Sequence, residues 1–342
     1  MSVRIKDIAE VAGVSSATVS LVLNGKKGVG DAKRAEILRI ASELGYRGGK
    51  GQPPSDGENR TLCFLRIARH GHIINRDHDV FIADYIEGLN QGCSDAGCSL
   101  QIVTFKSDPF DKILEFARES DARGLIILGT ELSEEEVLSF RGLTVPLVFI
   151  DTMYKYADFD FVDMNNEDSV HAVVAEFVEH GHRDIGVVSG RPGSPNLNLR
   201  KQEFLASLEF FGLPFRPECA FAVDPTFHGA YENMKAILGR RPSLPTALFC
   251  ANDIIAAGCL RALREGGVKV PRDISLIGFD DLPLASIADP PLTTVKVSKT
   301  RIGRTAVRLL SDRIESGNRA SISKVVVSGK LVRRDSVRRI GG

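Results

Sequence analysis

Residues 5–24 constrain this chain more than any other stretch, because their sequence, IKDIAEVAGVSSATVSLVLN, has the spacing of a helix-turn-helix. Ala9 is small enough to let a second helix approach the first closely, and Gly13 can take the positive φ that the turn requires. The buried apolar contacts are expected from four aliphatic side chains, Ile8, Val14, Val19 and Val22. The pattern therefore predicts two short helices that cross closely.

The second helix of this motif is predicted to read DNA. The side-chain oxygen of Ser15 or Ser16 can accept a hydrogen bond from a free backbone N–H in the first turn of that helix. The residues that follow are expected to face outward, where a recognition helix meets the major groove. The predicted DNA contacts are Lys6, Ser15, Ser16, Ala17, Thr18, Ser20, Leu21, Asn24, Lys26 and Arg34.

A third amphipathic helix over residues 32–44 completes an all-α headpiece, which we expect to span residues 1–47. The charge of the first 50 residues supports nucleic-acid binding, because Lys and Arg exceed Asp and Glu there by four in a chain whose net charge is zero. A purely structural helical hairpin is the alternative interpretation, since two packed helices occur in many folds. The position of the motif at the N-terminus, followed by the third helix, favours the headpiece.

Glycine, proline and polar residues fill residues 48–60, which are therefore predicted to form a linker. Residues 61–342 alternate short apolar runs with amphipathic helices, a pattern typical of parallel sheets with helical crossovers. We expect an α/β core of two doubly wound parallel-sheet lobes, approximately residues 61–160 plus 291–323 and residues 161–290 plus 324–340. Fully buried strands are predicted at 61–67, 99–105, 124–128, 146–150, 184–189, 246–250 and 274–279.

Several function classes are disfavoured by what the sequence lacks. No apolar run approaches the roughly 18–20 residues that span a bilayer, and the N-terminus has no apolar signal region, so we expect a cytoplasmic protein without a membrane partner. The phosphate-binding and catalytic signatures GxGxxG, GxxxxGK[ST], HExxH and GxSxG are absent. We therefore predict no enzyme activity, no catalytic residue and no cofactor.

A histidine-rich loop follows the first predicted strand of the core. His70, His72 and His78 lie there beside two aspartates and could bind a divalent metal ion. Nothing in their spacing fixes a tetrahedral site, however, and loop histidines near a cleft more often contact ligand or solvent. No metal site is predicted.

Several further segments follow one another in a characteristic order after IKDIAEVAGVSSATVSLVLNG. Among them are FVEHGHRDIGVVSG, PTALFCANDIIAAGCLRAL and VPRDISLIGFDD. With these segments the whole chain resembles the lactose-repressor (LacI/GalR) family of bacterial transcription regulators. The resemblance implies a core similar to periplasmic binding proteins that forms a homodimer and binds a small effector between its lobes. It also implies a repressor that binds double-stranded operator DNA.

The same resemblance implies an effector site built from Phe81, Asn196, Arg200, Asp224, Asn252, Asp253 and Asp280. Carboxylates, amides and a guanidinium can bond paired hydroxyl groups, while an aromatic ring offers an apolar face to a sugar. A carbohydrate is therefore the expected effector, in preference to a phosphorylated ligand or a dicarboxylate. For Asp253 and Asp280, capping of a helix N-terminus is the alternative role.

The chain departs from the family pattern in its linker and in its recognition helix. The family's linker carries a hinge helix whose leucine wedges into the minor groove, whereas residues 48–60 are rich in glycine and proline and offer no apolar wedge. We therefore expect weak or absent insertion of a hinge helix and less DNA bending. Leu21 stands where relatives often have Arg, so contacts with thymine methyl groups are expected in place of a guanine contact. The alternative function is a cytoplasmic solute-binding or sugar-binding protein without productive DNA binding.

Overall fold

The structure is a computed structural model that describes residues 5–23, 29–44, 60–72, 74–317 and 319–341. The chain divides into two compact units, Met1–Asn59 and Arg60–Gly342. The predicted contacts Asn24 and Lys26 and the linker residues 48–59 lie outside the described residues. No helix of the described ranges is long and apolar enough to cross a membrane.

The first unit contains helices α1 (Ile5–Ala12), α2 (Ser16–Leu23) and α3 (Asp31–Glu43). Its core is aliphatic, with Ile8, Val19 and Ile37 completely buried, one from each helix. Gly13 joins α1 to α2 with a φ of 62°, the left-handed conformation that glycine adopts without strain. The helix-turn-helix spacing thus arises from one small core and one glycine turn.

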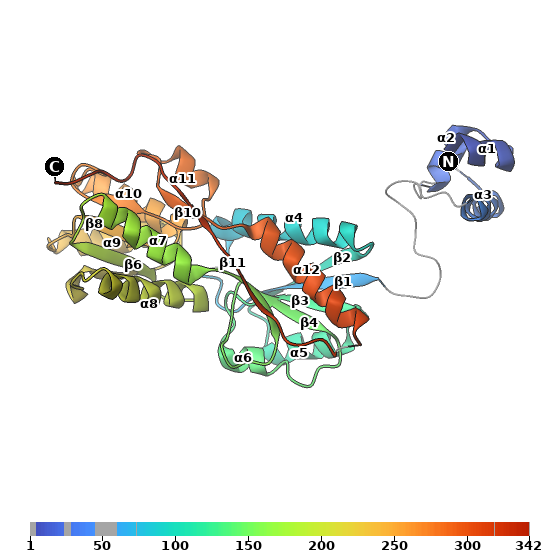
Figure 1. The fold of residues 1–342 in the computed structure, drawn as a ribbon, viewed down its shortest axis with the longest axis horizontal. Helices are drawn as coiled ribbons and strands as arrows, with labels where there is room; N and C mark the ends of the chain where they lie inside the picture. The colour runs from blue at the N-terminus through green and yellow to red at the C-terminus, as the bar shows by residue number, and fades with distance from the viewer. Residues whose placement is uncertain (1–4, 24–28, 45–59, 73, 318, 342) are drawn as a thin grey trace. The chain divides into compact units, whose positions relative to one another are not determined.

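The first lobe of the second unit is built on a six-stranded sheet of order β11-β5-β4-β3-β1-β2, in which all the pairs are parallel. Alternate residues of β1 point to opposite faces, so Phe64 packs on the side of α4 and α12 and Leu65 packs on the side of α5 and α6. Figure 1 shows these helix pairs covering the two faces. The elements of this lobe are β1 (Thr61–Ala68), η1 (Arg76–His78), α4 (Asp79–Asp95), β2 (Ser99–Lys106), α5 (Phe110–Glu119), β3 (Gly124–Leu128), α6 (Glu134–Leu138), β4 (Leu147–Ile150), β5 (Asp160–Met164), α12 (Lys299–Glu315) and β11 (Lys324–Val327).

The second lobe is built on a four-stranded parallel sheet of order β7-β6-β8-β9. Helices α7 and α8 cover one face and α9 and α10 cover the other (Figure 1). A two-stranded antiparallel sheet, β10 with β12, lies along the path between the lobes. The elements are α7 (Asn166–Glu179), β6 (Ile185–Gly190), α8 (Pro195–Phe210), η2 (Pro217–Cys219), β7 (Ala220–Val223), α9 (Phe227–Gly239), β8 (Ala247–Cys250), α10 (Asp253–Glu265), β9 (Ser275–Ile277), α11 (Pro283–Ile287), β10 (Thr294–Lys296) and β12 (Lys330–Val332).

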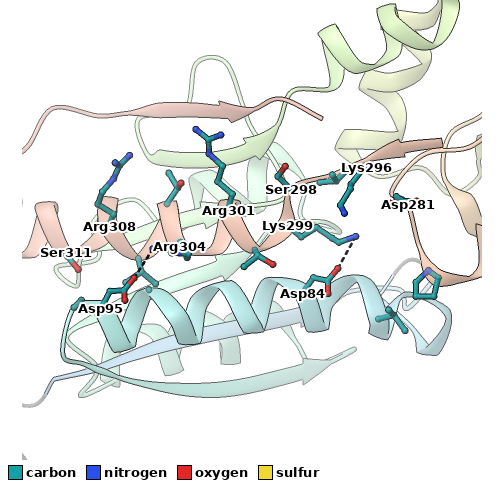
Figure 2. A pocket seen from close by; sticks show the side chains of 18 residues that line it. Asp84, Asp95, Asp281, Lys296, Ser298, Lys299, Arg301, Arg304, Arg308 and Ser311 are labelled. Carbon is teal, nitrogen blue, oxygen red and sulfur yellow. Dashed lines mark hydrogen bonds and ion pairs between the residues drawn. The ribbon is translucent and has the colours of Figure 1, made fainter. Parts of the chain in front are cut away.

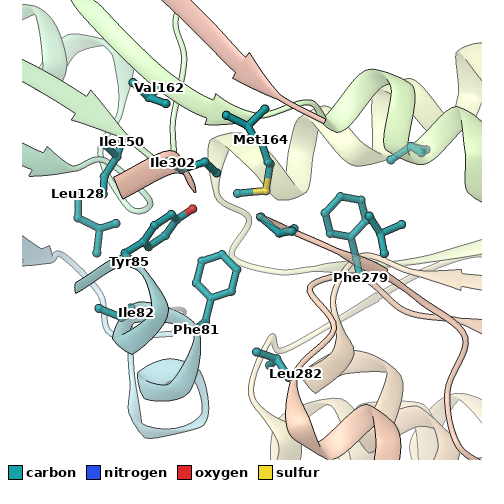
Figure 3. Packing of buried hydrophobic residues seen from close by; sticks show 14 of the residues in the cluster. Phe81, Ile82, Tyr85, Leu128, Ile150, Val162, Met164, Phe279, Leu282 and Ile302 are labelled. Atoms are coloured by element: carbon teal, nitrogen blue, oxygen red, sulfur yellow. The ribbon is translucent and has the colours of Figure 1, made fainter. Parts of the chain in front are cut away.

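One hydrophobic cluster continues from the first lobe into the second. Phe81 and Tyr85 of α4 approach the side chain of Met164 at the end of β5, with Phe279 and Leu282 on the side of the second lobe (Figure 3). The rings of Phe81 and Tyr85 meet edge to face, with centroids 5.2 Å apart. The lobes are therefore packed together at their junction, and the apolar part of the cavity described below belongs to this shared core.

Two sequence predictions are corrected by the fold. The strand at 99–105 is not buried, because β2 lies at the edge of the sheet and most of its side chains are exposed. The expected lobe division also shifts, because residues 161–164 and 324–327 pair with each other in the sheet of the first lobe. Residues 161–164 and 324–327 had been assigned to the second lobe.

The close packing of α4 on α12 predicts a strong effect of adding one methyl group. A Cβ at Gly88 would lie 2.2 Å from the carbonyl oxygen of Thr300, which is backbone and cannot rotate away. We expect Gly88→Ala to lower the free energy of unfolding by roughly 1–3 kcal/mol, as overpacking does. Gly239→Ala is the control, since a Cβ there meets nothing within 4 Å. Equal melting temperatures for the two variants would contradict this account of the helix contact.

Candidate functional site

The second helix of the headpiece presents small side chains to solvent. Val19 and Val22 turn into the core, while Ser16 and Leu21 are exposed and Thr18 and Ser20 are half-buried. Ser16 and Ser20 are four residues apart and therefore lie on one side of the helix. This side of α2 can approach the edges of bases without a long side chain in between.

Ser15 caps the N-terminus of α2. Its Oγ accepts a hydrogen bond from the backbone N–H of Thr18 at 3.1 Å and lies 2.9 Å from the Thr18 hydroxyl. Of the two serines proposed as the cap, Ser15 therefore fills the role. Lys6 is exposed on α1 and Arg34 is half-buried on α3, while Ala17 lies within α2.

The second unit contains a small cavity between its lobes, with a volume of about 30 Å³. That volume holds about one water molecule, so the side chains of the two lobes nearly fill the space. Its walls combine an aromatic and aliphatic side with carboxylates, amides and hydroxyls. The lining residues are Ile74, His78, Phe81, Ile82, Thr130, Asp151, Ser194, Asn196, Leu197, Arg200, Asn252 and Asp280.

Asn196 connects two buried carboxylates at this cavity. Its Nδ2 lies 3.3 Å from Oδ1 of Asp151 and 3.1 Å from Oδ1 of Asp163. Asp151 also accepts hydrogen bonds from the hydroxyl groups of Tyr85, at 3.0 Å, and Thr130. The amide of α8 in the second lobe is thus held by acidic groups at the strand ends of the first.

Arg200, one turn further along α8, lies flat against the ring of Phe279, with its guanidinium carbon 3.7 Å from the ring centroid. The guanidinium donates to the backbone oxygen of Ala251 at 2.6 Å and to Oδ1 of Asn166 at 2.9 Å. Its nearest carboxylate is Asp280, at a longer 3.5 Å. Arg200 is therefore fixed by carbonyl and amide oxygens more than by an ion pair.

The loop after β1 bridges the two lobes. Oδ2 of Asp77 accepts from the backbone N–H of Phe227 at 2.9 Å, and Nε2 of His78 lies 3.2 Å from Nδ2 of Asn252. Burial lowers the pKa of His78 to about 4, so this imidazole is neutral and accepts the amide hydrogen. The histidine-rich loop therefore makes contacts between lobes. Among the described residues no group of three or more His, Cys, Asp and Glu could hold a metal ion.

Burial disfavours the ionised form of the carboxyl groups that line the cavity or lie next to it. Burial raises the pKa of Asp280 to about 6 and that of Asp163 to about 7, and the neighbouring charge of Asp151 adds to the shift at Asp163. Asp151 and Asp280 also have positive φ angles of 59° and 110°, which non-glycine residues rarely adopt. Strained backbone and buried carboxylates at one cavity are typical of a ligand site.

Five of the seven residues expected at the effector site line this cavity, namely Phe81, Asn196, Arg200, Asn252 and Asp280. Asp224 lies outside it, where Oδ2 faces Nδ1 of His72 at 3.0 Å. Asp253 does not line the cavity; it is completely buried and accepts from the hydroxyl of Thr294 and the N–H of Leu282. Asn252 both lines the cavity and caps α10.

The sequence reasoning missed several polar lining residues. Asp151 directly follows β4, and Thr130 lies shortly after β3. The rule that ligands bind beyond strand ends could have found both. His78 lies on the loop that had been considered for metal binding, and Ser194 caps α8.

Comparisons with known proteins agree with this geometry. Residues 4–48 match the family of bacterial regulatory proteins, lacI family, and residues 174–337 match the periplasmic binding protein-like domain. The HTH-type transcriptional repressor PurR of Haemophilus influenzae is 32% identical over 98% of this chain and 99% of its own length. The chain belongs to the lacI family. It is a DNA-binding transcription regulator with a helix-turn-helix headpiece and an α/β core of two lobes.

Other proteins are also similar to this lacI-family regulator over nearly its whole length. PurR of Pasteurella multocida is 30% identical over 98% of each chain. The structure of a CelR–cellobiose complex aligns with a TM-score of 0.73 at 24% identity, covering 98% of this chain and 99% of the other. The Lac repressor dimer bound to operator and the anti-inducer ONPF aligns with a TM-score of 0.74 at 22% identity, covering 99% and 100%. These two structures support the fold.

The raised pKa of Asp163 predicts how the stability of the regulator depends on pH. The folded protein holds the Asp163 proton up to about pH 7, whereas an unfolded Asp loses it near pH 4, so this group makes stability fall as pH rises between those values. We expect Asp163→Asn to melt a few degrees higher than wild type at pH 8, with a smaller gain at pH 5. Asn can keep Oδ1 as the acceptor for Met164 N–H and Asn196.

The control for this measurement is Asp111→Asn, on the exposed side of α5. A melting-temperature difference between Asp163→Asn and wild type that did not change with pH would show that Asp163 is charged in the folded protein throughout this range.

Proposed function

We propose that this regulator is a homodimeric repressor whose affinity for operator DNA is changed by a neutral, hydroxyl-rich small molecule, a sugar, bound in the cavity between the lobes. The main support for the proposal is the set of side chains that line one cavity. The ring of Phe81 lies there together with the carboxylates of Asp151 and Asp280 and the amide of Asn196. Carboxylates and amides bond paired hydroxyls while a ring covers an apolar sugar face. The protein acts in the cytoplasm, and the proposal assigns it no enzyme activity.

The charge of the cavity favours a neutral ligand over an anionic one. Buried carboxylates outnumber the one guanidinium in the lining, and Arg200 is already engaged by oxygen acceptors. Arg66 and Arg69 of the first lobe are held by Asp79 and Glu136, at 2.6 and 2.7 Å. Among the residues that line the cavity, a phosphate would therefore meet acidic groups and no free cation.

The names of similar proteins support repression, dimer formation and sugar binding. The curated relatives are called repressors, the Lac repressor structure is a dimer on operator DNA, and the CelR structure contains cellobiose. A sugar needs more room than the present cavity, since ligand sites usually measure about 300 Å³ or more. Binding therefore requires the lobes to separate or the lining side chains to move. We propose that this conformational change alters DNA binding by the headpiece.

Selection from random DNA followed by a thermal-shift screen of sugars tests the proposal. We expect enrichment of a two-fold symmetric site by the full chain, and a sugar that raises the melting temperature, since a ligand at one hundred times its Kd adds about 2.7 kcal/mol of stability. A sugar that stabilises the protein without any enriched site would favour the solute-binding alternative. Enrichment of a site without two-fold symmetry would contradict the homodimer.

Phe81→Leu is predicted to weaken binding of the identified sugar by about tenfold, because the leucine fills space without offering a flat ring. The measurement is calorimetric titration of the full chain. Phe210→Leu is the matched control, since the Phe210 ring is 73% exposed on α8 and does not line the cavity. Equal affinity of the Phe81→Leu variant and wild type would place the sugar elsewhere.

Lys6→Ala is predicted to weaken binding to selected and unrelated DNA by a similar factor, because an exposed lysine on α1 contacts phosphate rather than bases. The slope of log affinity against log salt should decrease by about one. Titration by fluorescence anisotropy at several salt concentrations measures both. Loss confined to the selected site would instead show that Lys6 reads a base.

A further inference from the structure

A second surface of the core carries features of a binding site and is separate from the effector cavity. It is a groove of about 1080 Å³ between α4 and α12, which we call the α12 groove. Its walls contain five basic residues and three acidic residues, in a core whose net charge is negative. The basic residues are Lys296, Lys299, Arg301, Arg304 and Arg308, and the acidic residues are Asp84, Asp95 and Asp281.

Each acid of the α12 groove already has a cationic partner. Asp84 lies 3.2 Å from Nζ of Lys299, and Asp95 lies 3.0 Å from the guanidinium of Arg304. Asp281 is held by Arg334, which lies outside the groove, at 2.6 Å. Within the part of the chain that the structure describes, these pairings leave the cations Lys296, Arg301 and Arg308 facing solvent with no acid of the groove to balance them.

The unbalanced cations do not converge on one point. Figure 2 shows Arg301 and Arg308 projecting from one side of α12, while Lys299 and Arg304 turn toward α4. Seven residues along a helix separate Arg301 from Arg308 by about 10.5 Å. A single phosphate could not bridge that separation, so the spacing favours an extended acidic surface over a small anion.

The opposite wall of the groove adds partly exposed acids and an exposed valine. The side chains of Asp84 and Asp95 are 51% and 65% exposed, and Val80 at the start of α4 is 48% exposed. A DNA backbone, which is uniformly negative, would be repelled by those acids. A second copy of this chain is also disfavoured, because a two-fold interface sets the patch against itself and the acids of the patch already have cationic partners, so its unbalanced cations would find no free acid on the copy.

We propose that the α12 groove docks an acidic segment of a partner protein, whose carboxylates pair with Arg301 and Arg308. Charge complementarity of this kind mainly sets the association rate and partner choice, while Val80 supplies an apolar contact. The groove adjoins the effector site, because Lys299 also donates to the backbone oxygen of Asp280 at 3.0 Å and lies 5.0 Å from the centre of the Phe81 ring. A partner docked in the α12 groove thus contacts residues next to the effector site and acts as a second regulator of the core.

The test uses the full chain and a fluorescein-labelled oligoglutamate peptide as the probe. We expect the double variant R301E/R308E to bind the peptide at least about tenfold more weakly than wild type in fluorescence anisotropy. The matched control is K112E/R118E, which reverses two exposed charges on α5, on the opposite face of the same sheet. Because the control carries the same net charge, it separates the groove from general electrostatics and from binding to the basic headpiece.

Four outcomes would overturn the proposal. The two double variants could lose the same affinity, which would mean that no particular surface is recognised. R301E/R308E could weaken binding of an unrelated DNA duplex while leaving the peptide unaffected, which would make the groove a DNA contact. R301E/R308E could change the oligomeric state measured by sedimentation, which would make the groove an interface between copies. Inorganic pyrophosphate could displace the peptide at micromolar concentration, which would indicate a small-anion site.

Discussion

A buried hydrogen-bond network across the lobe junction is the interaction on which the core depends. Asn196 and Arg200 lie one turn apart on α8, and between them they engage Asp151, Asp163 and the backbone of Ala251. Charged groups in an interior are tolerated only when such partners surround them. Asn196, Arg200 and Asp151 also line the cavity, so a ligand bound there would compete with polar contacts that hold the lobes together.

Under the proposed function, this sharing of contacts is the means by which binding at the cavity would act on the headpiece. A sugar that bonds Asp151 and Asn196 exchanges interlobe hydrogen bonds for ligand bonds and thereby favours a different separation of the lobes. Around the polar groups, the aromatic contacts of Phe81 and Phe279 belong to one continuous core (Figure 3). Packed cores shift between discrete arrangements more readily than they deform, which suits a regulator with two states.

Much of this architecture could be predicted from the sequence because its signals are local. Apolar runs identified the central strands, and one glycine with a set of small aliphatic residues identified the headpiece. Strand β5, DFVDM, was missed because two buried aspartates interrupt its apolar pattern. Asp163 could not be found, because its role depends on Asn196 from another lobe. The exposure of β2 depends on its place in the strand order, which an apolar run does not encode.

Coupling of the cavity to the headpiece is tested by the affinity of the full chain for its selected operator, measured with and without a saturating effector. The account predicts a change of at least about fivefold in Kd, because coupling between two sites in allosteric proteins is usually 1–3 kcal/mol. The sign of the change would separate an inducer from a corepressor. An unchanged Kd, with the effector shown to be bound by its thermal shift, would contradict the coupling of the cavity to the headpiece.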